Sequence, residues 1–100
     1  MKQIVRRFIY YPLIQWDYLY NEKDFRNEIK KIFFDVFQNM NEDNFSWDKQ
    51  QKDYENWDSF AQLNLITLSE AKFEITLSLD EAIEIKSADE LYKCIKSHLA

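Results

Sequence analysis

The chain has 100 residues, and none of them is glycine. Tight β-hairpins place residues at positive φ angles, which glycine adopts at the lowest cost. Helices joined by polar loops have no such requirement, so the absence of glycine favours an all-α fold. Hydrophobic residues make up 46% of the chain and aromatic residues 17%, which is enough apolar surface for the core of one domain.

The spacing of apolar residues divides the chain into an N-terminal extension and a helical domain. Residues 1–22 contain six aromatic side chains and are interrupted by Pro12, so we expect an extra segment that packs against the domain. Residues 23–100 form the domain. Its first helix is predicted over 23–39, with Asp24 as N-cap or first-turn acid. Six residues of that helix share one apolar face: Phe25, Ile29, Ile32, Phe33, Val36 and Phe37.

A long polar loop over residues 40–57 separates this helix from two further main helices and a short one. The second main helix is predicted over 59–73, the short helix over 80–85, and the last over 88–98. Ser87 and Glu90 have the capping-box spacing at the start of the last helix. We expect four aromatic residues to anchor the loop: Phe45, Trp47, Tyr54 and Trp57. The expected inner face of helix 59–73 is Phe60, Leu63, Leu65 and Ile66, closed by Phe73 and Ile75.

The charge of the chain is unevenly distributed. Residues 1–39 contain seven Lys/Arg and five Asp/Glu, whereas residues 40–100 contain six Lys and thirteen Asp/Glu, for a net charge of -5 overall. Nucleic acid is therefore not an expected partner, because phosphate contacts need clustered Lys/Arg. No apolar run reaches the about 20 residues that span a bilayer. We expect a cytoplasmic monomer without stable membrane insertion.

The residue counts argue against most catalytic and metal sites. His98 is the only histidine, so a nucleophile–histidine–acid arrangement is not expected, and a glycine-rich phosphate loop is impossible. Cys94 is the only cysteine, so we expect no internal disulfide and no cysteine-based metal site, and the count also argues against any metal site of His and Cys. Its neighbours Leu91 and Ile95 predict a buried, inert thiol. We therefore expect no enzyme, no catalytic residue and no metal ligand.

Taken alone, Asp58 and Ser59 just before an apolar helix indicate an ordinary helix cap. From Trp57 to the C-terminus, however, the chain resembles the acyl carrier proteins. Their Asp-Ser-Leu signature corresponds to Asp58-Ser59-Phe60, and both Leu and Phe are expected to bury an apolar side chain there. The resemblance continues through Glu70 to Ala82 and the stretch from Ile85 to Leu91. The Trp-Asp-Ser form is similar to free-standing carriers of specialised pathways.

The resemblance implies an acyl-carrier-like bundle of three main helices plus one short helix. It also implies that Ser59 carries a covalent 4′-phosphopantetheine arm from coenzyme A. Asp58 and Phe60 would then contact the phosphopantetheinyl transferase. Such a protein carries acyl intermediates as thioesters between acyl-loading and acyl-transferring enzymes of fatty-acid-like or specialised biosynthesis. Helix 59–73 departs from the family pattern because Glu70 is its only acid.

Three alternatives remain open from the sequence. The cargo on the arm could be an aminoacyl or peptidyl group. The chain could instead be a non-carrier helical interaction module that uses its aromatic N-terminus as a docking arm. A third possibility is a membrane-surface protein anchored by residues 4–20, a segment rich in aromatic side chains.

Overall fold

The computed structural model describes residues 21–99. Within this range the protein consists of four α-helices and one turn of 3₁₀ helix, with no strand. The helices are α2 (Glu22–Val36), α3 (Ser59–Phe73), α4 (Leu79–Glu84) and α5 (Ala88–Leu99), and the 3₁₀ turn is Gln51–Asp53. The prediction of an all-α fold with three main helices and one short helix is confirmed for this part of the chain.

Helix α2 begins one residue earlier and ends three residues earlier than predicted. Its N-cap is Asn21, whose side chain accepts a hydrogen bond from the Asp24 backbone N–H at 3.0 Å, so Asp24 is a first-turn acid. Asn21 and Glu22, assigned to the extension by the sequence, thus cap and begin the helix. The rest of the predicted extension lies outside the described residues. At the other end Phe37 is extended, with φ of -108° and ψ of 100°.

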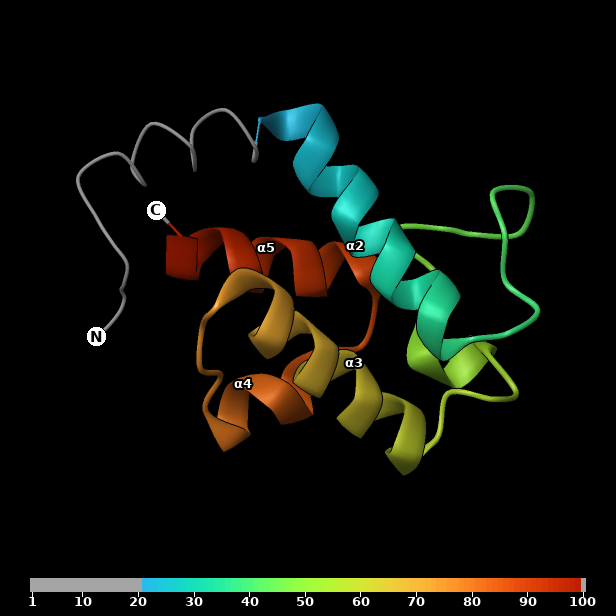
Figure 1. Cartoon of the computed structure of the whole chain (residues 1–100). Coiled ribbons are helices and arrows are strands. Elements are labelled where there is room, and N and C mark those ends of the chain that lie inside the picture. Colours follow the sequence, from blue (N-terminus) through green and yellow to red (C-terminus); the bar gives the residue numbers. More distant parts are fainter. Residues whose placement is uncertain (1–20, 100) are drawn as a thin grey trace.

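The apolar face of α2 forms one wall of the core and contacts both α3 and α5 (Figure 1). Ile29 and Phe33 are completely buried, and Phe37 remains buried beyond the helix end. The Phe33 ring packs edge-to-face on Trp57, with ring centroids 5.6 Å apart. Burial of an aliphatic or aromatic side chain of this size stabilises a fold by about 1.5–3 kcal/mol, so this face is the main source of stability for α2.

The long loop between α2 and α3 is held by its aromatic side chains, as predicted. Trp57 is buried, and three others are partly buried against the core: Phe45, Trp47 and Tyr54. Two backbone hydrogen bonds also attach the loop to the segment around the start of α5. The Gln51 N–H donates to the Lys86 carbonyl at 2.7 Å, and the Asp89 N–H donates to the Trp47 carbonyl at 2.8 Å.

The predicted inner face of α3 is only partly correct. Leu65 and Ile66 are buried, but Phe60 and Leu63 are 78% and 61% exposed. The buried residues of α3 are Ala61, Leu65, Ile66, Ser69 and Phe73. Four of these recur every fourth residue from Ala61, so the small side chains of alanine and serine occupy core positions that the hydrophobic pattern alone did not reveal.

The end of α3 shows how a chain without glycine makes a left-handed helix terminus. Glu74 has a φ of 55°, the one positive φ among the described residues. Its N–H donates to the Glu70 carbonyl, and the Ile75 N–H donates to the same carbonyl at 3.2 Å. Glycine usually occupies this position, and a residue with a side chain costs roughly 1–2 kcal/mol there.

Helices α4 and α5 each follow directly after a serine. Ser78 and Glu81 form a reciprocal capping box at α4. At α5 the Ser87 hydroxyl accepts from the Glu90 N–H at 3.1 Å, as predicted, but the Glu90 carboxylate accepts from Lys86 rather than from Ser87. None of the helices between residues 21 and 99 combines the length and the hydropathy needed to cross a membrane.

Candidate functional site at the start of helix α3

Ser59 is the first residue of α3, and it is exposed. The preceding residue, Asp58, is the N-cap and has an extended backbone. Its Oδ1 accepts a hydrogen bond from the Ala61 N–H at 2.9 Å, and its carbonyl accepts from the Gln62 N–H at 2.9 Å. Asp58 therefore provides the acceptors for the backbone N–H groups of Ala61 and Gln62. The N–H groups of Ser59 and Phe60, the first two residues of α3, have no acceptor within the helix.

The first turn of α3 contains no acidic residue, although the domain as a whole is acidic. The helix has 15 residues, so the partial positive charge at its N-terminus is fully developed. An anion attached to the Ser59 oxygen would lie beside this positive end and beside unpaired backbone N–H groups. This is the arrangement that binds phosphate in many proteins.

A partly buried hydrogen-bond network holds the chain just before Ser59. The Trp57 indole N–H donates to the Gln62 side-chain oxygen at 2.6 Å. The Gln62 amide nitrogen donates to the carbonyls of Ala82 and Ile85, at 2.6 and 3.1 Å. Gln51 donates to the Trp57 carbonyl at 3.1 Å. These bonds join the loop, α3 and α4 close to Ser59.

The Ser59 hydroxyl has no side-chain base among the described residues. The only histidine of the chain, His98, is paired with Glu81 instead. A serine needs an adjacent base to act as a nucleophile in a reaction of its own. Within residues 21–99, no side chain is therefore placed to activate the Ser59 hydroxyl.

The structure corrects the expectation for Phe60. We predicted that its side chain would be buried near the helix start, but it is 78% exposed. The reason is the rotation of α3 about its axis, because the neighbouring residue Ala61, and not Phe60, faces the core. Phe60 is therefore available for contact with another molecule. Large exposed apolar side chains also occur nearby in the sequence and on the adjoining helix α4: Leu63, Leu79 and Ile83.

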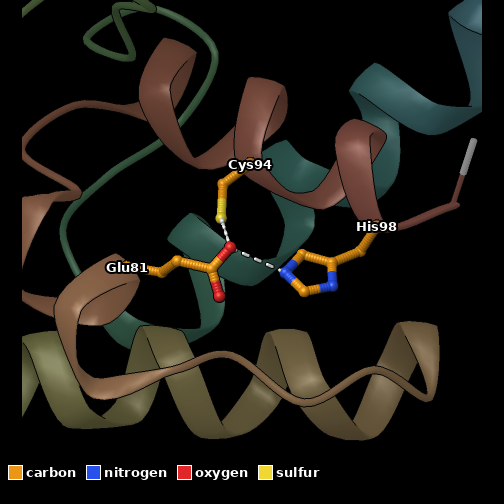
Figure 2. Close-up of side chains that lie close together, drawn as sticks. All are labelled: Glu81, Cys94 and His98. Atoms are coloured by element: carbon orange, nitrogen blue, oxygen red, sulfur yellow. Dashed lines mark hydrogen bonds and ion pairs between the residues drawn. The ribbon is translucent and has the colours of Figure 1, made fainter.

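The sequence pattern did not predict the role of Gln62. It also did not predict that three residues with possible metal-ligand side chains lie together elsewhere in the fold. Gln62 is five residues from Trp57, and its role depends on α4 lying beside α3, which no local pattern shows. Among residues 21–99, ligand atoms of Glu81, Cys94 and His98 lie within 4.8 Å of one another. The spacing of Cys94 and His98 places both on one helix face, but Glu81 comes from α4 (Figure 2).

Cys94 is partly buried rather than fully buried as predicted. Burial, together with the nearby Glu81 carboxylate, raises the pKa of its thiol to about 11. The thiol is therefore protonated near neutral pH and is not a reactive nucleophile in the metal-free protein. This agrees with the predicted inertness of Cys94.

Comparison of the whole chain with protein-family models, with curated proteins and with solved structures gave no match. The function must therefore be inferred from the side chains and geometry of this chain itself.

Proposed function

We propose that this chain is a carrier protein that holds acyl or related intermediates as thioesters on a 4′-phosphopantetheine arm attached to Ser59. The single observation that carries the proposal is the place of Ser59, which is exposed at the first position of a 15-residue helix. The resemblance of residues 57–100 to acyl carrier proteins supports the same residue. The fold would then be an acyl-carrier-like bundle, with the long loop between its first and second main helices.

The start of α3 provides what a phosphodiester at Ser59 requires. Attachment would form one bond between Ser59 Oγ and phosphorus and break the pyrophosphate bond of coenzyme A. Adenosine 3′,5′-bisphosphate and the hydroxyl proton would be released. The anion left on the serine gains typically about 0.3–1 kcal/mol from the helix dipole at an exposed site. The thiol of the arm, rather than Cys94, would hold the cargo, so the carrier itself needs no catalytic residue.

Partner enzymes would recognise apolar side chains around the serine. Phe60 and Leu63 are exposed on α3, next to the attachment point. Helix α4 lies beside α3, since Gln62 bonds to the Ala82 carbonyl, and it exposes Leu79 and Ile83. Glu70, the one acid of α3, is partly buried and already accepts a hydrogen bond from the Leu77 N–H at 2.9 Å. Recognition of this carrier would therefore depend more on apolar contact than on charge.

The test is modification by a broad-specificity phosphopantetheinyl transferase with coenzyme A, followed by intact mass measurement. We expect one arm on the native chain and none on Ser59→Ala. Ser78→Ala is the matched control, because Ser78 is also exposed at a helix start, and it should keep the modification. Failure of several different transferases to modify the native chain would contradict the carrier proposal.

The exposed apolar residues also favour a second candidate, a helical interaction module without an arm. Phe60 and Leu63 would then bind a partner directly, and Ser59 would be only the residue after the cap. The two functions differ in one property. Binding by an interaction module would survive Ser59→Ala and fail in Phe60→Ser, whereas thioester transfer by a carrier requires Ser59 itself.

A further inference from the structure

Three side chains that can act as metal ligands lie close together between α4 and the C-terminal half of α5 (Figure 2). This place is separate from Ser59. Glu81 Oε2 lies 2.8 Å from His98 Nε2 and 3.8 Å from Cys94 Sγ. Glu81 and Cys94 are partly buried, and His98 is exposed. In Figure 1 the start of α3 and the C-terminal end of α5 lie at opposite ends of the view, so the cluster is not part of the proposed attachment site.

We propose that Glu81, Cys94 and His98 bind one Zn²⁺, with water as the fourth ligand. Thiolate, imidazole and carboxylate are the three side-chain ligands that zinc prefers, and three protein ligands plus water is a common coordination. The mixed set of one sulfur, one nitrogen and one oxygen disfavours Mg²⁺ and Ca²⁺, which take oxygen ligands. This proposal departs from the sequence expectation that one His and one Cys are too few for a metal site, because the third protein ligand is a carboxylate.

The two ligands on α5 have the spacing that brings side chains to one face. Cys94 and His98 are four residues apart, so they lie one above the other on the helix. Zinc bonds of 2.0–2.3 Å at tetrahedral angles place neighbouring ligand atoms about 3.3–3.7 Å apart. The observed separations of 2.8 and 3.8 Å are on either side of that range. A metal ion would therefore need only small side-chain rotations, chiefly to separate Glu81 from His98.

The capping box of α4 orients the Glu81 carboxylate toward this space. Its Oε1 accepts from the Ser78 N–H at 2.9 Å, while its Oε2 points toward Cys94 and His98. The hydrogen bond from Ser78, followed by that from His98, lowers the pKa of the Glu81 carboxyl, which keeps it ionised. A ligand carboxylate that is itself held by a hydrogen bond to its other oxygen is typical of metal sites in proteins.

Zinc at this position would join the short helix α4 to the end of α5. Helix α4 has six residues and none of them is fully buried, so its own packing holds it weakly. Binding of the metal to the folded state alone would raise the stability of the whole domain. The zinc would thus hold α4, which also exposes Leu79 and Ile83, against α5.

The test uses the full-length chain whose intact mass shows no pantetheine arm, so that Cys94 is the only thiol present. Titration with Co²⁺ should give the near-ultraviolet absorption of a thiolate–cobalt bond, and Zn²⁺ should abolish it at one equivalent per chain. Zn²⁺ should also raise the melting temperature. Loss of a ligand should weaken Zn²⁺ binding by more than the about 10- to 100-fold typical of an outer-shell partner. The variants are Cys94→Ser, Cys94→Ala, His98→Gln and Glu81→Gln.

Two controls keep the outcome clear. Glu81→Gln preserves the capping box, in which glutamine replaces glutamate, so its loss of binding reports ligation and not unfolding. Glu84→Gln removes an exposed acid from the same helix and should bind Zn²⁺ like the native chain. Absence of the thiolate–cobalt band, or equal Zn²⁺ affinity in the native chain and Cys94→Ser, would contradict the proposal. Glu81 and His98 would then form only an ordinary ion pair. Saturation at half an equivalent with dimer formation would also overturn the proposal, because it indicates a site shared between two chains.

Discussion

Asp58 and Ser59 are neighbours in the chain, but their side chains have different surroundings. The Asp58 carboxylate accepts a hydrogen bond from the Ala61 N–H at 2.9 Å. Ser59 is exposed and has no bond to a base within residues 21–99. Under the carrier proposal, Asp58 builds the helix terminus and Ser59 carries the arm. This division would allow a common Asp-Ser cap to serve also as the proposed attachment site.

Replacing the cap separates its structural role from its charge. Asp58→Ala should lower the free energy of unfolding by about 0.5–2 kcal/mol, because the Ala61 N–H loses its acceptor. Asp58→Asn should be close to the native chain in stability, since asparagine caps helices as well as aspartate. Urea denaturation followed by circular dichroism measures both. Equal stability of native chain and Asp58→Ala would show that the cap contributes nothing.

Single residues were predicted from the sequence where one local pattern decides their role. The pairing of Ser87 with Glu90 was predicted and found, although only one of the two bonds forms. The same Ser-x-x-Glu spacing at Ser78 and Glu81 was not recognised, although it forms the complete box. Phe60 was misplaced because hydrophobicity alone does not show which side of a helix faces inward.

Helix α3 has two apolar sides, and only one of them belongs to the core. Leu65 is completely buried, while Leu63 is 61% exposed two positions away. Alanine and serine complete the buried side, so the sequence lacks the sharp apolar stripe that defines α2. The rotation of α3 about its axis therefore follows from packing against α2 and could not be obtained from the pattern of α3 alone.

Two matched truncations test this rotation. Leu65→Ala should lower the free energy of unfolding by about 2–5 kcal/mol, since it leaves a cavity in the core. Leu63→Ala removes the same atoms from the surface and should change stability by about 0.5 kcal/mol or less. Chemical denaturation at one temperature gives both values. A larger loss for Leu63→Ala than for Leu65→Ala would reverse the assigned faces of α3.

At the scale of the whole molecule, the start of α2 and the middle of α5 are joined by one polar group of residues. The Tyr92 hydroxyl donates to Glu22, 70 residues away in sequence, and Lys96 donates to both. Arg26 lies over the Tyr92 ring at 4.3 Å and also pairs with Glu22. The Tyr92 hydroxyl is the main cause of the lowered pKa of the Glu22 carboxyl.

This link predicts a pH-dependent effect of Tyr92→Phe. A carboxyl with a lowered pKa stabilises the folded state above its unfolded value, near 4.5, and the contribution disappears as pH falls through the folded value. The variant should therefore be less stable than the native chain near neutral pH, and the difference should shrink in acid. Urea midpoints across this range provide the measurement.

Tyr54→Phe is the control for that comparison. The Tyr54 hydroxyl is buried and has no hydrogen-bond partner among the described residues, so its removal should cost little at any acidic pH. A stability difference for Tyr92→Phe that stays constant from neutral to acid pH would contradict the assigned bond to Glu22.

The most direct measurement of the central claim is the position of the arm on the chain. After treatment with coenzyme A and a phosphopantetheinyl transferase, the chain is digested and each serine-containing peptide is sequenced by mass spectrometry. We expect one phosphopantetheine, carried by Ser59, while the buried Ser69 of the same helix stays unmodified. An arm on any other residue, or no arm with any transferase, would contradict the account of this site.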